Sequence, residues 1–222
     1  MVAWSYSSIK TFDQCPKKYY HLKVAKDVKD EAGPEADYGT AAHKAAEDNI
    51  KFGVPIPGRF KFMEPTIEAL NAIPGDKHCE LKLGVRKTAA GYEPCDFFAK
   101  DVWWRGIADL IIISGDRAYV VDYKTGKNTK YADTKQLDLL AGAVFVHFPK
   151  IKKIKSALAY VVTDELIKAT HEAPKCGEYL SVFDSVLDNL EIAQATGVWN
   201  AKSSGLCGWC PVTSCEHHRK RR

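Results

Sequence analysis

The sequence predicts an α/β fold in which helices flank a mixed central β-sheet. Two almost wholly apolar segments, 106–114 and 117–123, follow one another across a short turn, which is typical of paired strands buried in a sheet. Apolar side chains recur at helical spacing both before and after these strands. Strands with helices on both sides in sequence favour an α/β sandwich.

Capping residues and spacing give the order of the elements. The first helix is expected to begin at one of the serines Ser5, Ser7 and Ser8, and it carries Cys15-Pro16. Further helices are expected at residues 40–51, 64–72, 133–146 and 179–195. Strands are expected at residues 79–85, around 97, and at 102–113, 117–123, 156–162 and 165–171.

Composition indicates a globular protein outside the membrane. The 222 residues suit one domain, and the hydrophobic and charged fractions, 45% and 27%, are ordinary for such a domain. No apolar run is long enough for a membrane helix, and the first residues lack the pattern of a secretory signal. We therefore expect a cytoplasmic protein whose seven cysteines are thiols or metal ligands.

The distribution of charge permits a nucleic-acid partner but does not require one. The net charge is only +4, and the basic residues gather at 17–18, 150–155 and 219–222. Such groups can meet phosphates, although solvated surface explains them equally well. The sequence contains no Walker phosphate loop, so it encodes no ATP-driven motor.

The two apolar strands each carry an acid where a charge is costly. Asp109 interrupts the first, and Asp122 and Lys124 end the second. Gly115-Asp116 between them is a favoured two-residue hairpin turn with glycine first. Asp109 and Asp122 are equally far from this turn, so they are expected to face each other with Cβ atoms roughly 5 Å apart, and Lys124 shares their face.

Two facing carboxylates indicate a cation between them. Magnesium prefers oxygen ligands and keeps several waters, so two carboxylates suffice to hold it beside a phosphodiester. Lys124 could then orient an attacking water and offset transition-state charge. The alternative is a structural ion pair of Lys124 with one of the acids.

These residues resemble the PD-(D/E)XK nuclease superfamily, in particular its RecB-like branch, which includes helicase-associated, CRISPR-adaptation and phage nucleases. Asp109 stands at the first acidic position, and Asp-Tyr-Lys-Thr-Gly at 122–126 matches the second. The segment 39–47, with His43, is similar to an upstream helix whose histidine binds metal. Gln136 and the residues after it resemble a downstream helix motif, except that Leu140 replaces its usual tyrosine. Ala108 replaces the proline of the superfamily's name.

The resemblance implies a restriction-endonuclease-like core and a metal-dependent DNA nuclease. His43, Asp109, Asp122 and the backbone carbonyl of Tyr123 would hold Mg²⁺ or Mn²⁺. Lys124 would help activate water, and Gln136 would lie near the scissile phosphate. The implied activity is that of an exonuclease acting on single-stranded DNA or free ends. Glu80, in an earlier strand, is interpreted as a surface carboxylate that could at most support the site.

A second group of candidate ligands is formed by Cys207, Cys210 and Cys215. Their short spacing in a reducing compartment indicates metal binding. The resemblance adds Cys15 and implies a [4Fe-4S] cluster that joins the two ends of a single nuclease domain spanning 1–222. Residues 1–30 and 197–222 would form the cluster lobe, and 36–172 the catalytic core.

Some interpretations stay open on the sequence alone. Zinc is the alternative metal, with His217 or His218 as fourth ligand. Cys79, Cys95 and Cys176 are interpreted as ordinary small buried side chains. Tyr131 and Trp209 could stack on bases. The alternative functions are a non-catalytic, metal-stapled nucleic-acid-binding module and a subunit acting with a helicase or recombinase.

Overall fold

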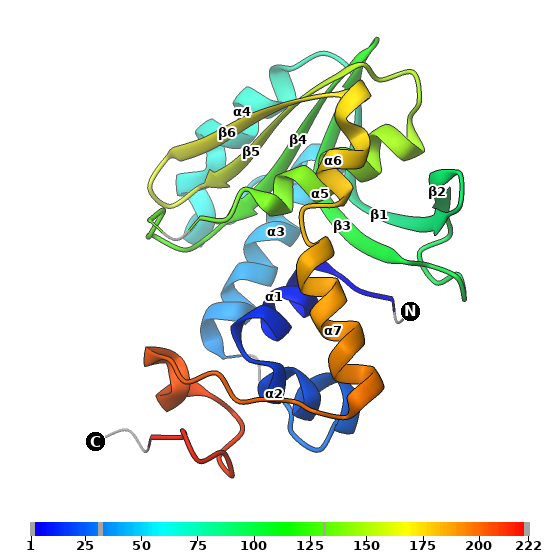
Figure 1. The fold of residues 1–222 in the computed structure, drawn as a ribbon. Coiled ribbons are helices and arrows are strands. Elements are labelled where there is room, and N and C mark those ends of the chain that lie inside the picture. The colour runs from blue at the N-terminus through cyan, green and yellow to red at the C-terminus, as the bar shows by residue number, and fades with distance from the viewer. Residues whose placement is uncertain (1–2, 31–32, 131, 220–222) are drawn as a thin grey trace. The chain divides into compact units, whose positions relative to one another are not determined.

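The computed structural model describes residues 3–30, 33–130 and 132–219, and the chain divides into two compact units (Figure 1). We call Gly33–Val182 the sheet unit. Met1–Ala32 together with Phe183–Arg222 form the terminal unit. Tyr131, a candidate for base stacking, and residues 220–222 of the basic tail lie outside the described residues.

The sheet unit contains a mixed six-stranded sheet in its described part, as predicted. The strands are β1 (Asp76–Thr88), β2 (Gly91–Cys95), β3 (Trp104–Ser114), β4 (Arg117–Lys124), β5 (Lys153–Tyr160) and β6 (Glu165–Glu172), in the order β2-β1-β3-β4-β5-β6. β4 and β5 run parallel, and every other neighbouring pair is antiparallel. The strand expected around Phe97 is wrong, because Phe97 lies in a turn after β2.

The β3–β4 hairpin has the predicted turn and register. Gly115 has φ 63, in the left-handed region that a two-residue turn with glycine first requires. The strands pair from Ser114↔Arg117 to Leu110↔Val121. The bonded ladder ends there, one position before Asp109 and Asp122 would meet. β4 continues in its pairing with β5 as far as Lys124, so the two strands part where the acids lie.

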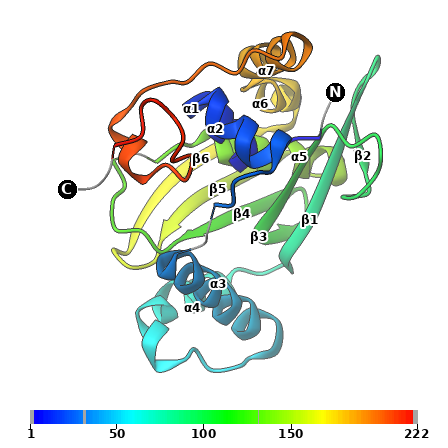
Figure 2. The same ribbon diagram turned by 90° about the horizontal axis from the view of Figure 1, so that it is seen from below.

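Helices cover both faces of the sheet (Figure 2). α3 (Pro34–Phe52) and α4 (Glu64–Ala72) pack on one face, with a 3-10 turn (Gly58–Met63) between them. Small buried side chains of α3, Ala42 and Ala46, let it approach the strands closely. α5 (Lys135–His147) covers the opposite face, where Leu137 packs on Leu158, and forms the crossover between the parallel strands.

A buried polar network fixes α5 against the last two strands. His171 of β6 is 1% exposed, and its Nε2 lies 2.9 Å from Asp138 Oδ1 of α5. Its Nδ1 lies 3.4 Å from Ser156 Oγ of β5. Because buried polar groups are costly unless paired, this network constrains the start of α5, which carries Gln136.

The terminal unit is helical and contains α1 (Tyr6–Gln14), α2 (Pro16–Tyr19), a π-helix (Tyr20–Ala25), α7 (Asp184–Thr196) and a 3-10 turn (Gly205–Trp209). Ser5 caps α1 in a reciprocal capping box with Ser8, which confirms the predicted start. Trp199 stacks on Tyr19 with ring centroids 6.0 Å apart and also contacts Phe12. This aromatic group ties the C-terminal segment to α1 and α2.

Two predicted helices are interrupted. Cys15 has φ −163 and separates α1 from α2, because a proline disfavours the helical conformation of the residue before it. The helix predicted at 179–195 is two helices, α6 (Cys176–Leu180) and α7, separated by a turn at 181–183. Within the described residues, no helix combines the length and apolarity needed to cross a membrane.

Candidate active site

Three groups meet where β3 and β4 part. His43 lies on α3, which begins at Pro34 and ends at Gly53 in a left-handed cap. His43 Nδ1 lies 3.4 Å from Asp109 Oδ2, and its Nε2 lies 3.0 Å from the carbonyl oxygen of Tyr123. The Tyr123 N–H donates to Asp109 Oδ2 at 2.7 Å. The structure therefore brings together three of the four predicted metal-binding groups.

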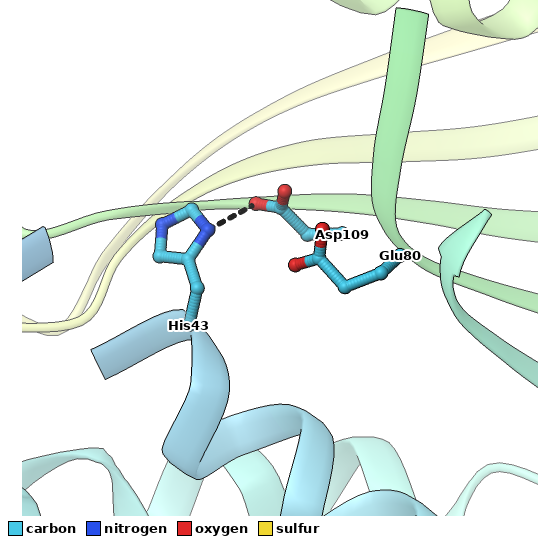
Figure 3. A group of neighbouring side chains, drawn as sticks. All are labelled: His43, Glu80 and Asp109. Carbon is cyan, nitrogen blue, oxygen red and sulfur yellow. Dashed lines mark ion pairs between the residues drawn. The ribbon is translucent and has the colours of Figure 1, made fainter. Parts of the chain in front are cut away.

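Glu80 joins this group, so its interpretation as a surface carboxylate is wrong. Ligand atoms of His43, Glu80 and Asp109 all lie within 4.8 Å of one another (Figure 3). On β1, Glu80 stands between the bonded pairs Cys79↔Leu110 and Leu81↔Ala108, at the level of Asp109. Its φ of 53 is a left-handed conformation that a glutamate adopts at a cost of about 1–2 kcal/mol.

The sequence held no clear signal for Glu80. The β1–β3 register depends on the connection through β2, and no two-residue turn fixes it as Gly115 fixes the next hairpin. A left-handed glutamate in the middle of a strand is also not readable from residue types. A strained residue beside a charged cluster is a common feature of functional sites.

Asp122 is held in a second, adjoining network. Its side chain is buried, and its Oδ2 lies 2.5 Å from Lys124 Nζ. Lys124 Nζ donates to Gln136 Oε1 at 3.0 Å, and Gln136 Nε2 donates to Asp122 Oδ1. The ion pair considered as an alternative is therefore present, and it lies beside the His43 group. Leu140 is buried in the core.

Each ionised acid in this site disfavours ionisation of the others. Burial raises the pKa of Asp122 to about 6, and the charge of Asp109 adds to this, against the opposing effect of Lys124. Burial and the charge of Asp109 also raise the pKa of Glu80. For His43, burial lowers the pKa, but the hydrogen bond and charge of Asp109 outweigh it, so the pKa is raised. An excess of negative charge in a partly buried site is what a bound cation would relieve.

The donor set fits a divalent cation. Carboxylate and carbonyl oxygens suit Mg²⁺ and Mn²⁺, and one imidazole favours a transition metal such as Mn²⁺. The carboxylates of Glu80 and Asp109 provide such oxygens within 4.8 Å of the His43 nitrogen. The carbonyl of Tyr123 is 3.0 Å from the same ring. The residues present are therefore compatible with Mg²⁺ or Mn²⁺.

The cysteines of the terminal unit also gather at one place. A cavity of about 440 Å³ is lined by Cys15, Cys207, Cys210, Cys215, His217 and His218, with Trp209 at its wall. Backbone N–H groups of Lys18 and Lys202 lie 3.5 Å from Cys15 Sγ, and that of Ser204 lies 3.3 Å from Cys207 Sγ. Hydrogen bonds from backbone N–H groups to sulfur are a common feature around cysteines that hold metal clusters.

Comparison with known proteins identifies the family of this chain. Residues 3–73 and 76–215 match the family model described as PD-(D/E)XK nuclease superfamily. The chain is similar to the crystal structure of the protein SSO0001, with 14% identity, a TM-score of 0.51, and coverage of 98% of this chain and 88% of that one. It is also similar to a Eubacterium rectale protein named "Putative exonuclease", with 15% identity, a TM-score of 0.49 and the same coverage. A search of curated protein sequences finds no match. The chain therefore belongs to the PD-(D/E)XK nuclease superfamily.

Proposed function

We propose that the protein is a DNA nuclease that depends on Mg²⁺ or Mn²⁺. The observation that carries this proposal is the convergence of His43, Glu80, Asp109 and the Tyr123 carbonyl beside the pair of Asp122 and Lys124. His43, Asp109, Asp122 and the carbonyl are the proposed ligands, and Glu80 is added to them by the geometry. Membership of a nuclease superfamily supports hydrolysis of a phosphodiester.

When bound, the cation would polarise the phosphate and make a bound water more acidic. Asp109 fixes the backbone at Tyr123, because its Oδ2 accepts the Tyr123 N–H at 2.7 Å. That contact aims the Tyr123 carbonyl toward His43. One side chain thus positions two of the proposed ligands.

Lys124 and Gln136 act on the reacting groups in this proposal. Lys124 Nζ is 2.5 Å from Asp122 and 3.0 Å from Gln136, so both partners fix the direction of its flexible side chain. A positioned ammonium group can orient a water and stabilise negative charge as it develops on the phosphate. Gln136 accepts a hydrogen bond from Lys124 and donates one to Asp122. It thereby fixes the positions of these two side chains relative to each other.

Attack on single-stranded DNA or free ends, and exonuclease action, follow from the resemblance of the motifs to the RecB-like branch. Digestion of end-labelled single- and double-stranded DNA with Mg²⁺ or Mn²⁺ tests this directly. Release of single labelled nucleotides would support exonuclease action and give its polarity. Accumulation of long internal fragments would instead indicate an endonuclease. No cleavage of either substrate would favour the non-catalytic binding module.

We also propose that Cys15, Cys207, Cys210 and Cys215 hold a [4Fe-4S] cluster. Two features support it: the four cysteines line one cavity, and backbone N–H groups point at two of the sulfurs. Zinc with His217 or His218 remains the rival, because both histidines line the same cavity. Iron and zinc analysis of protein purified without oxygen distinguishes the two.

A separate helicase or recombinase would supply strand separation, since the sequence contains no phosphate loop for ATP. This partnership is part of the proposal and rests on the same RecB-like resemblance. Co-purification from the native host, followed by reconstitution of digestion on long duplexes, tests it. A nuclease that degrades long duplexes unaided would make the partner unnecessary.

A further inference from the structure

Strands β1 and β3 carry a group of cations and aromatic rings that the nuclease site does not use. Lys82 Nζ lies 5.8 Å from the ring centroid of Phe97 and 5.4 Å from that of Phe98. Arg105 Cζ lies 5.5 Å from the Phe97 ring. The two rings are 5.0 Å apart and nearly perpendicular. We call these four side chains the aromatic platform.

The platform is exposed although its rings are large and apolar. Phe98 is 70% exposed, and the neighbouring Ile107 is 41% exposed. In the loop that carries the rings, the Phe98 N–H donates to Asp96 Oδ1 at 2.7 Å. An exposed ring with a cation over it indicates a binding surface.

The charges of the platform are not neutralised internally. In the described part of the chain, neither Lys82 nor Arg105 forms an ion pair with a carboxylate. Two acids close to the rings in sequence have other partners: Asp101 pairs with Arg86 at 2.8 Å, and Asp96 accepts the Phe98 N–H. Two cations without acidic partners are complementary to a polyanion.

The platform lies on the path to the proposed metal site. Asp109, Ile107 and Arg105 occupy alternate positions of β3, so their side chains are expected on one face. Lys82 pairs with Ile107 in the β1–β3 register. Two residues of strand span about 7 Å, which places Lys82 one such step from the level of Asp109. Only a short stretch of nucleic acid is needed to reach both places.

We propose that the aromatic platform binds the unpaired bases of single-stranded DNA and so feeds that strand to the metal site. This inference rests on the proposed function, and it names the substrate as single-stranded. Phe97 and Phe98 offer ring surfaces on which bases stack, and Lys82 and Arg105 contact the adjoining phosphates. Bases in a duplex are already stacked on each other, so the rings discriminate against double-stranded DNA.

The test measures binding separately from cleavage. Fluorescence anisotropy of a labelled oligothymidine is recorded with the Lys124→Ala protein in Mg²⁺, so that turnover does not destroy the probe. Phe98→Ala in this background should weaken binding roughly 10- to 100-fold, because each stacked base contributes on that scale. Phe98→Trp keeps a stacking surface and should restore it.

Two controls make the result specific. Phe52 is 71% exposed on α3, away from the platform in sequence, and Phe52→Ala should leave binding unchanged. An abasic oligonucleotide of equal length and charge should bind the parent weakly and be insensitive to Phe98→Ala. Independently, Lys82→Ala should reduce the magnitude of the slope of log affinity against log salt by about 0.7, the contribution of one phosphate contact on a single strand.

Unchanged affinity of Phe98→Ala for oligothymidine would overturn the platform, as would an equal loss for the abasic strand, which would show that the ring does not stack on bases. These outcomes do not depend on hydrolysis. Failure of the wild type to cut any DNA would instead refute the nuclease proposal, and the binding data would still decide the platform.

Discussion

The two proposed metal sites of this chain differ in what positions their ligands. In the sheet unit, Glu80, Asp109 and the Tyr123 carbonyl lie on strands whose pairing fixes their places. In the terminal unit, Cys207, Cys210 and Cys215 lie in a short 3-10 turn and the loop after it. Strand pairing therefore holds the ligands of the first site, whereas three cysteines of the second lie on a segment with little regular structure.

The burial of the two regions supports this difference. The sheet unit surrounds its acids with a core in which Leu110 and Ile112 are fully buried. Among residues 201–219, all of them described, Val212 is the single buried side chain. A segment with so little apolar burial gains its order from other sources, such as bound metal. Metal removal should therefore affect the two sites in different ways.

The largest expected effect is on turnover in the sheet unit. Asp109→Asn should lower the cleavage rate by at least about 1,000-fold, since it removes a metal-binding charge. Asparagine keeps an oxygen that can accept the Tyr123 N–H, so the melting temperature should stay within a few degrees of the parent. Initial rates and thermal melts of the same preparation check this. If the variant unfolds, Asp109 is needed for folding, which would contradict its proposed role as a metal ligand alone.

The next largest effect is on the terminal unit. Wild type purified without oxygen should be brown, absorb broadly near 400 nm and contain about four irons per chain. Cys15→Ala should lose the colour and melt at lower temperature, because the cluster closes a loop of nearly the whole chain. Cys95→Ala, which changes a cysteine of β2 outside the cavity, is the matched control. A colourless wild type with one zinc, and Cys15→Ala like the parent, would replace the cluster with the zinc site.

A smaller effect concerns pH and the buried acid Asp122. Its pKa is raised from 3.8 to about 6 in the folded chain. Well below pH 3.8 the group is protonated in both states; as pH rises from there toward 6 the unfolded chain ionises first, so folding stability falls. The loss approaches about 3 kcal/mol above pH 6 without added divalent metal. Asp122→Asn should remove this dependence and melt higher at pH 7. The prediction would be contradicted if the melting temperatures of both proteins changed with pH in the same way from pH 4 to 8.

The smallest predicted effect is the contribution of Glu80 to metal affinity. Glu80→Gln keeps the shape of the side chain and removes its charge, so Mn²⁺ affinity should fall about tenfold. Its pKa is raised by burial and by the charge of Asp109, which identifies it as part of the repulsion that the cation relieves. Calorimetric titration with Mn²⁺ measures the change. Glu93→Gln, at an exposed position of β2, is the control and should bind as the parent does. Equal affinities of the parent and Glu80→Gln would leave the cation to His43, Asp109, Asp122 and the Tyr123 carbonyl.

Local rules account for the parts of the fold that could be predicted. Gly115-Asp116 fixes the β3–β4 register by turn geometry, and residues 64–72 form α4 over the predicted range. Ser5 predicts the start of α1, because its side chain caps the helix. The break at Cys15 follows from the proline after it, a local signal that the helical prediction overlooked.

Long-range contacts account for the parts that could not. Glu80 enters the site through its left-handed conformation, which depends on the packing of β1 against β3 and not on its neighbours in sequence. The contact between Gln136 and Asp122 depends on where the crossover helix begins, which the His171 network fixes. Likewise, the aromatic platform forms because β1, β3 and the loop after β2 meet in space.

The central claim is that Lys124 belongs to a metal-dependent cleavage site, and one measurement tests it most directly. Single-turnover cleavage of an end-labelled oligonucleotide is compared for wild type and Lys124→Ala at saturating Mn²⁺, with metal affinity checked by titration. The proposal predicts that Lys124→Ala binds Mn²⁺ about as well as wild type but cleaves at least about 100-fold more slowly, because the lysine acts on the reacting groups. Equal cleavage rates in the two proteins would contradict the claim and leave Lys124 as a structural partner of Asp122.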